Sequence, residues 1–273
     1  MLRSMLTAAN TMNALQERLD TISHNIANSN TVGFKRREAS FAELLAQQVD
    51  RLPADEAPRE TPAGVRYGNG AHLASTMLVS AQGTLVETGR ALDFAFTAAN
   101  QWFRVQVANA NGDTTIGYTR AGNFSVTPMD GRLALVTSDG RPVLDEANRP
   151  IEFPTGTTGF QLSPTGTLTA TDASGAVVAR VNLGVTAIDR PQLLEAQGDN
   201  VFTLPDVPGA ARELNGNLRG QIGVKQGALE QSNVDLGEEM VGLMATNRAY
   251  QLNARAISIS EQMLGLINGM RSS

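Results

Sequence analysis

Cysteine is absent from this 273-residue sequence, and histidine occurs only twice, at His24 and His72. The lack of cysteine excludes a disulfide framework, a thiol nucleophile and cysteine-ligated zinc or iron–sulfur sites. Neither histidine has a second histidine at metal-ligand spacing, so we expect both to be solvated or interface residues. The sequence therefore predicts no metal site, no cofactor and no catalytic residue.

Long apolar runs and an excess of positive charge are also missing. No run approaches the 18 or more apolar residues that a membrane span needs, and no apolar region typical of a cleaved signal peptide follows Arg3. The formal charge of −5 argues against binding nucleic acid through its phosphates. Aromatic residues make up only 5% and glycine is frequent, which favours short strands and turns. We expect no nucleic-acid partner, no membrane insertion and no cleaved signal peptide.

The stretch 234–270 is predicted to form one long helix with two apolar stripes. The first stripe follows the four- and three-residue steps typical of helix pairing, and it comprises Leu252, Ala256, Ile259, Met263, Leu266 and Met270. The second stripe lies on a different face and comprises Met240, Leu243, Tyr250, Ala254, Ile257 and Leu264. Ser232, Asn233 and Asp235 can cap the start of this helix. A helix that is apolar on two faces requires more than one neighbour.

The N-terminal segment has a matching pattern. The same spacing recurs over almost four heptads and predicts a helix over residues 2–27, with a stripe formed by Met1, Met5, Ala8, Met12, Leu15, Leu19, Ile22 and Ile26. Because the other faces are polar, such a helix is marginal in water unless its stripe is covered. The simplest partner is the C-terminal helix.

Between the helices the apolar period changes to two. Residues 36–75 read as an extended or linker segment that is rich in proline at 52–63, and residues 76–230 read as an inserted antiparallel β domain, a sandwich or irregular barrel. The expected strands are 102–107, 116–119, 124–127, 132–136 and 177–185. The turn signals between them are Asn111-Gly112, Asp130-Gly131, Asp139-Gly140 and Ser174-Gly175. We expect an α+β fold in which 1–35 and 232–273 form a terminal helical coiled-coil domain.

Two segments carry a resemblance to a known family. Residues 25–36 resemble the N-terminal signature of bacterial flagellar rod, hook and hook-associated proteins, and residues 227–254 are similar to the C-terminal signature of that family. The matching residues include Asn25, Asn28, Asn30, Gly33, Phe34, Lys35, Ser232, Asn233, Arg248 and Tyr250. Residues 64–71, 81–85 and 118–124 resemble the distal-rod and proximal-rod branch, and the size fits the rod proteins better than the larger hook protein. Within that branch the resemblance is strongest to the distal rod. The chain departs from the pattern at 98–103, where the family has a Gly-x-Gly-Phe-Phe turn.

The resemblance implies a structural subunit of the flagellar basal-body rod that transmits torque for motility. In that family the terminal helices pair as an inner coiled coil, and copies stack into a helical tube. The implied partners are further copies of this chain, other rod and hook proteins, and the type III export apparatus, which exports such subunits uncleaved to an extracytoplasmic position. The interface residues that we expect are Met5, Met12, Leu15, Leu19, Ile22, Ile26, Met240, Leu243, Tyr250, Leu252, Ile257, Ile259, Met263 and Leu266.

Other interpretations of these patterns stay open. The heptads are compatible with a helix hairpin inside one chain, and residues 25–35 with a plain helix stop and loop. Asn247, Arg248 and Asn253 either face solvent or form hydrogen bonds between subunits. The Asp-Gly-Arg sequences at 130–132 and 139–141 are interpreted as turns.

An enzymatic or binding role is the main alternative. The sequence has no phosphate loop, nucleophile elbow or dinucleotide fingerprint. Asp93 and Glu87 are an acidic pair of the type used in glycoside hydrolysis, but sequence does not place two carboxylates face to face. The competing hypothesis is therefore a secreted carbohydrate-binding or carbohydrate-processing β domain with a coiled-coil oligomerisation module.

Overall fold

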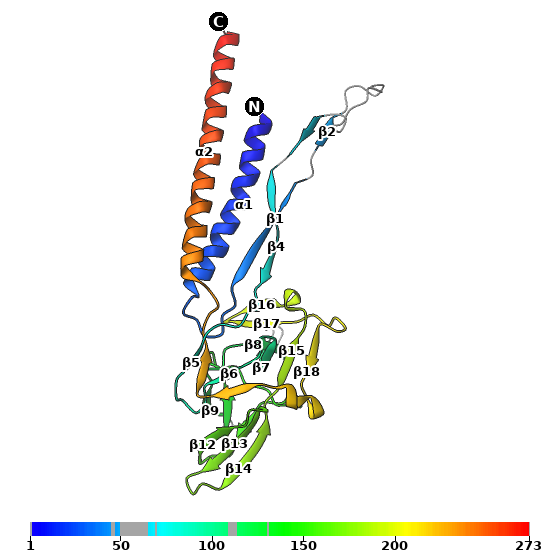
Figure 1. Ribbon diagram of the computed structural model, residues 1–273, viewed down its shortest axis with the longest axis vertical. Coiled ribbons are helices and arrows are strands. Elements are labelled where there is room, and N and C mark those ends of the chain that lie inside the picture. Colours follow the sequence, from blue (N-terminus) through cyan, green and yellow to red (C-terminus); the bar gives the residue numbers. More distant parts are fainter. Residues whose placement is uncertain are drawn as a thin grey trace. The chain divides into compact units, whose positions relative to one another are not determined.

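The chain adopts an α+β fold in a computed structural model that describes residues 2–44, 47–49, 65–68, 70–108, 114–129 and 131–272 (Figure 1). Its contacts divide into two compact units. The helical unit contains Met1–Ile26, Arg37–Met77 and Asp235–Ser273, and the β unit contains Ala27–Arg36 and Leu78–Val234. Residues 27–35, which we expected to belong with the helices, thus have most of their contacts in the β unit.

Two long helices and four strands form the part of the helical unit that the structure describes. They are α1 (Leu2–Ala27), β1 (Arg37–Glu43), β2 (Gln47–Val49), β3 (Val65–Tyr67), β4 (Ala71–Leu78) and α2 (Leu236–Ser272). The predicted bounds of the first helix, 2–27, are confirmed. A side chain at Gly242 would lie 3.5 Å from Ile22 Cδ1, and Asn25 bonds to Glu239, so α1 and α2 run antiparallel where they meet.

A single aspartate caps the N-terminus of α2. Asp235 Oδ1 accepts the N–H groups of Gly237 and Glu238 over 2.8 and 3.2 Å. These are amides without an intrahelical partner, so the carboxylate satisfies the exposed first turn. Of the other two predicted caps, Ser232 accepts the amide of Val234 and Asn233 bonds elsewhere in the β unit.

The segment that we expected to be extended or a linker forms paired strands. β1 pairs with β4 and β2 with β3, so the segment folds back on itself. Gly70 has a φ of +100°, and a side chain there would lie 3.0 Å from the Thr7 carbonyl oxygen of α1. Arg18 of α1 lies 5.8 Å from the centre of the Phe41 ring. The proline-rich stretch 52–63 lies outside the described residues.

Short antiparallel strands build the β unit. They are β5 (Leu85–Glu87), β6 (Phe94–Phe96), β7 (Gln101–Ala108), β8 (Thr114–Thr119), β9 (Ser125–Met129), β10 (Arg132–Val136), β11 (Glu152–Phe153), β12 (Thr157–Leu162), β13 (Thr167–Asp172), β14 (Val177–Asn182), β15 (Val185–Ile188), β16 (Glu195–Gly198), β17 (Val201–Thr203), β18 (Ala211–Glu213), β19 (Val224–Gln226) and β20 (Ala228–Glu230), with 3₁₀ helices η1 (Pro191–Leu193) and η2 (Gly216–Gln221). The largest sheet has the open order β16-β17-β8-β7-β15-β18. Its core includes the stacked pair Phe96 and Phe103 and the edge-on pair Phe103 and Phe124.

Most strand predictions in this unit are confirmed, and one is wrong. β7, β8 and β10 cover the expected runs, and β9 begins one residue later than the expected 124–127. The expected strand 177–185 is two strands, β14 and β15, in different sheets. The break falls at Gly184, where a side chain would lie 2.6 Å from the Asp145 carbonyl oxygen. Gly140 and Gly175 have φ values of +80° and +84°, as the predicted turns require. Asn111-Gly112 and Asp130 lie outside the described residues.

Candidate functional site

One face of α2 is covered within the chain. The buried and half-buried residues on this face recur at alternating steps of four and three residues. They are Glu239, Leu243, Thr246, Tyr250, Asn253, Ile257, Ser260 and Leu264. The apolar members belong to the predicted second stripe, although Met240 of that stripe is exposed. The Thr246 and Ser260 hydroxyls and the Asn253 amide nitrogen each donate a hydrogen bond to the carbonyl oxygen four residues earlier, so these donors are satisfied within the helix.

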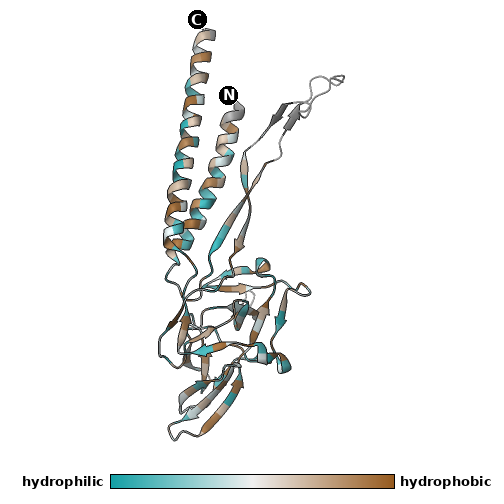
Figure 2. Ribbon diagram, viewed as in Figure 1, coloured by the Kyte–Doolittle hydropathy of each residue, from teal (hydrophilic) through white to brown (hydrophobic). Residues whose placement is uncertain are grey.

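The first predicted stripe of α2 is exposed. Leu252, Ile259, Leu266 and Met270 are 64%, 55%, 70% and 74% exposed. At about 100° of rotation per residue, this stripe lies roughly 140° around α2 from the covered face, so one neighbouring helix cannot cover both. Figure 2 shows hydrophobic residues recurring along the whole described length of α2. The stripe that we expected to pair with α1 is therefore open within the chain, and its pairing stays a prediction.

The predicted stripe of α1 is largely covered. Ala8 and Ile22 are buried, and Met5, Met12, Leu15, Leu19 and Ile26 are half-buried. Ala14, which lies outside the predicted stripe, is also buried, whereas Leu6 is 64% exposed. The side chain of Met1 lies outside the described residues.

Asn25 joins the two ends of the chain within the helical unit. Its Nδ2 donates to Glu239 Oε1 over 3.0 Å and to the Arg37 carbonyl oxygen over 2.8 Å, and its Oδ1 accepts the Arg37 amide over 3.0 Å. Asn25 is 1% exposed, so these bonds satisfy an amide that has no access to water. The first residue of the N-terminal signature therefore acts inside the chain.

The β unit contains a buried group of three charged residues, Lys35, Arg120 and Glu230, which we call the Glu230 clasp. Lys35 Nζ lies 2.5 Å from Glu230 Oε1, and Arg120 Nε donates to Glu230 Oε2 over 2.9 Å. Glu230 Oε1 also accepts the amide of Gly83 over 2.9 Å. Each of the three charged residues is 1% exposed. The clasp thus joins residues 195 positions apart in the chain.

Arg120 extends the clasp to the segment where the chain departs from the family pattern. Its Nη1 donates to the carbonyl oxygens of Ala98, Ala99 and Gln101 over 2.8, 2.9 and 2.7 Å. The guanidinium carbon lies 5.4 Å from the centre of the Phe96 ring, within cation–π range. Carbonyl groups and an aromatic ring thus replace water around this cation.

Two cations share one carboxylate in this clasp. Burial is the main cause that lowers the pKa of Lys35, and the neighbouring Arg120 lowers it further, while Glu230 acts in the opposite direction. Burial likewise lowers the pKa of Arg120. A buried charge is tolerated only where it is paired and hydrogen-bonded, so both cations depend on Glu230.

Further bonds hold the signature segments together in the β unit. The Gly33 amide donates to the Glu230 carbonyl oxygen over 2.7 Å, and the Arg36 amide donates to Asn233 Oδ1 over 2.7 Å. Asn233 Nδ2 donates to the carbonyl oxygen of Val79 over 2.9 Å. Phe34 is buried. The two signatures are thus bonded to each other inside one chain.

The remaining signature and polar candidates have local roles. Asn28 Oδ1 accepts the Thr31 hydroxyl over 3.2 Å, and Asn30 is exposed. Asn247 accepts a hydrogen bond from Gln251, and Arg248 is exposed on α2. Their predicted bonds to other subunits remain predictions.

Asp93 and Glu87, the acidic residues considered above, each have partners of their own. Asp93 accepts the Thr88 hydroxyl over 2.7 Å and lies 3.4 Å from Arg90, whereas Glu87 lies 2.5 Å from Lys225. Among the described residues, no three histidine or acidic side chains are grouped to hold a metal ion. No helix in the described part of the chain is both long and apolar enough to span a membrane.

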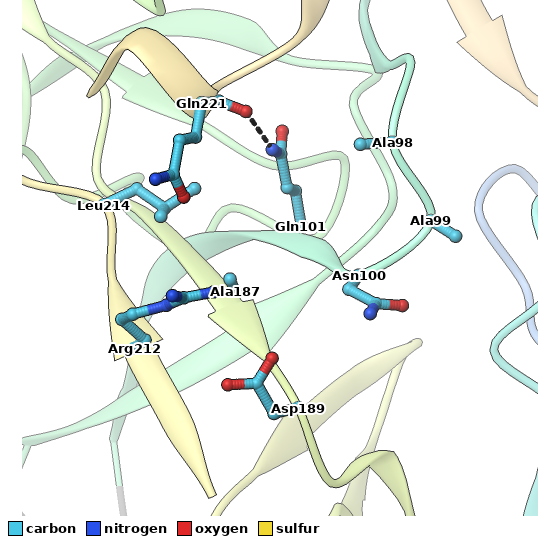
Figure 3. A pocket seen from close by; sticks show the side chains of 9 residues that line it. All are labelled: Ala98, Ala99, Asn100, Gln101, Ala187, Asp189, Arg212, Leu214 and Gln221. Atoms are coloured by element: carbon cyan, nitrogen blue, oxygen red, sulfur yellow. Dashed lines mark hydrogen bonds between the residues drawn. The ribbon is translucent and has the colours of Figure 1, made fainter. Parts of the chain in front are cut away.

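An open hollow of about 260 Å³ lies beside the segment that departs from the family pattern (Figure 3). Ala98, Ala99 and Asn100 line it, with Asp189 and Arg212 as its charged side chains. Gln101 Nε2 donates to the Gln221 carbonyl oxygen over 2.7 Å at one end. The segment that departs from the family pattern thus lines this hollow, and its backbone carbonyl groups are bonded to Arg120.

These features define the class of the protein. It is an α+β protein whose terminal segments are bonded to each other and whose long C-terminal helix presents an open apolar face, as structural proteins that assemble with partners do.

Comparisons with known proteins identify the family. A model of the C-terminal region of flagellar basal body rod FlgEFG proteins matches residues 225–270, a model of flagella basal body rod proteins matches residues 5–35, and a model of the flagellar hook protein FlgE/F/G D1 domain matches residues 97–170. The chain belongs to the flagellar basal-body rod and hook protein family.

Relatives align over nearly the whole chain. The chain is 45% identical to the flagellar hook-basal body complex protein FlhP of Bacillus subtilis, covering 99% of this chain and all of that protein. It is 33% identical to the flagellar basal-body rod protein FlgG of Borreliella burgdorferi, over 99% of each chain, and 32% identical to FlgG of Bacillus subtilis, over 97% of each chain. These relatives do not support the alternative of a carbohydrate-binding or carbohydrate-processing protein.

The sequence did not identify Arg120 and Glu230 as members of a buried charged group. Arg120 and Glu230 both lie in segments that resemble the family, but nothing in their local pattern shows that they meet. The available signal was a charged residue at the end of an apolar strand run, which is compatible with either a solvated or a buried position.

Proposed function

We propose that this protein is a structural subunit of the flagellar basal-body rod that polymerises with copies of itself into a helical tube and transmits torque. Family membership and relatives named as rod proteins support the rod assignment. The role is structural, without catalysis, and the distal end of the rod is the proposed position.

The observation that carries polymerisation is the open stripe of α2. From Leu252 to Met270 it runs for about 27 Å at 1.5 Å per residue. Each leucine, isoleucine or methionine in it contributes about 1.5–3 kcal/mol when covered, so an uncovered stripe favours association. When this helix face is covered by a different surface of the next copy, the contact is heterologous. Heterologous contacts that do not close into a ring produce helical filaments.

In the assembled rod, the terminal helices of neighbouring copies form the inner coiled-coil layer and the β unit lies outside. The proposed partners are further copies of this chain, other rod and hook proteins and the type III export apparatus. Export occurs without a cleaved signal peptide, and the final location is the extracytoplasmic basal body.

Charge placed on the open stripe tests this proposal. We expect the double variant Leu252→Asp/Leu266→Asp to abolish rod assembly and swimming while changing the free energy of unfolding of the monomer by less than about 0.5 kcal/mol, because both positions face solvent in the monomer. Gln251→Asp/Gln262→Asp is the matched control, since both glutamines are exposed on α2 outside the stripe. Swimming cells that assemble rods from the stripe variant would contradict the proposal.

A further inference from the structure

The segment that follows α1 is held in the β unit by the segment that precedes α2. We call them the N-connector (residues 27–36) and the C-connector (residues 228–234). Three contacts join them: Gly33 amide to Glu230 carbonyl at 2.7 Å, Lys35 Nζ to Glu230 Oε1 at 2.5 Å, and Arg36 amide to Asn233 Oδ1 at 2.7 Å. The N-connector also bonds to Ala81 through Lys35 Nζ over 2.7 Å and to Asn200 through the Val32 carbonyl oxygen over 3.0 Å, but its only carboxylate partner in these bonds is Glu230.

Because of the charges in the Glu230 clasp, the N-connector depends more on the C-connector than the C-connector depends on the N-connector. If the N-connector leaves, Glu230 keeps Arg120 and the Gly83 amide as partners, so the carboxylate remains neutralised and bonded. If the C-connector leaves, Lys35 and Arg120 lose the carboxylate they share, and two neighbouring cations keep only backbone carbonyl oxygens as hydrogen-bond partners. Loss of one partner of a buried charge pair is strongly destabilising, and like charges add to that cost.

We propose that Glu230 is a one-way latch: the C-connector docks first, and only then can the N-connector and its lysine enter the β unit. The N-connector, which attaches the N-terminal helix to the β unit, is therefore held in place only after the C-connector has docked. A chain that ends before residue 230, or whose C-connector is detached, loses all three of these contacts and holds its N-connector less firmly. Incomplete subunits therefore fail to present both terminal helices. This inference depends on the fold of a single chain and not on assembly of a rod.

Amide hydrogen exchange of the full-length monomer tests the latch, measured on peptides that cover each connector. We expect Glu230→Gln to speed exchange in residues 27–36 on the order of 100-fold, the scale that follows the loss of a buried charge partner. We expect Lys35→Met to speed exchange in residues 27–36 and to leave residues 228–234 within about threefold of the parent, since Arg120 still neutralises Glu230. The matched control is Lys225→Met, which removes an exposed lysine–glutamate pair with the same 2.5 Å spacing and should change neither connector.

Three outcomes decide the inference. Unchanged protection of residues 27–36 in Glu230→Gln would refute the latch, and equal opening of both connectors in Lys35→Met would show that the dependence is mutual and not one-way. If Glu230→Gln does not fold, addition of Lys35→Met should restore part of the thermal stability by removing one unpaired cation. Failure of that double variant to recover any stability would contradict the charge argument.

Discussion

At the scale of residues, Gly33 and Glu230 bring two distant parts of the chain into contact. Gly33 has a φ of +67°, and its amide donates to the Glu230 carbonyl oxygen. A side chain at this position would lie 2.5 Å from the Ala121 amide nitrogen and from the Arg120 carbonyl carbon. The glycine is therefore required both for its backbone conformation and for the close approach of two segments.

Substitution of Gly33 by alanine should weaken the β unit. We expect Gly33→Ala to lower the free energy of unfolding by about 2–5 kcal/mol, because backbone strain and steric overlap add together. Gly175→Ala is the matched control, since Gly175 has a φ of +84° with open space around it, and only the strain of about 1–2 kcal/mol applies. Denaturant unfolding of the three proteins measures the difference, and equal losses in both variants would contradict this packing role.

Sequence reasoning identified only part of these residue roles. Gly33 and Lys35 were recognisable from the family signature, and Asp235 from its place before an apolar periodic run. The pairing of Lys35 with Glu230, and of Glu230 with Arg120, was not predictable, because partners 195 and 110 residues apart are brought together by the fold and not by local spacing.

At the scale of elements, the helices were the most predictable parts. A heptad pattern that is sustained over almost four repeats is typical of a helix and incompatible with the two-residue period of a strand, and α1 has the predicted bounds. The face of α2 that contacts its own chain was not predictable, because both stripes are apolar and only one is covered. The prediction of a single strand at 177–185 was wrong because the apolar residues alternate without interruption. This pattern does not show that the chain passes to another sheet at Gly184.

The buried and half-buried stripe of α1 leads to a prediction about the stability of the helical unit. We expect Leu19→Asp/Ile22→Asp to release the terminal helices while the β unit stays folded, because a carboxylate at buried Ile22 loses both its packing and its hydration. Limited proteolysis of the monomer measures this: the terminal segments should be cut faster and the β unit should resist. The matched control is Gln16→Asp/Ser23→Asp on the exposed side of α1. Loss of the β unit together with the helices would contradict the division into two units.

At the scale of the whole molecule, the open stripe of α2 and the bonded connectors point to complementary tasks. The connectors, which follow α1 and precede α2, are bonded to each other within one chain. The stripe leaves apolar surface on α2 that a neighbouring chain can cover. We propose that this stripe becomes buried when the rod assembles. Because the chain has no cysteine, a single introduced thiol can be followed without background.

Maleimide labelling of Leu266→Cys measures that burial most directly, with Val177→Cys on β14 as the reference for an exposed site on the β unit. Labelling rates are compared between the purified monomer and isolated basal bodies, each against the denatured protein. We predict that position 266 reacts readily in the monomer, where Leu266 is 70% exposed, and becomes protected by at least about tenfold in basal bodies. Equal reactivity of position 266 in the monomer and in basal bodies that contain this chain would contradict the account.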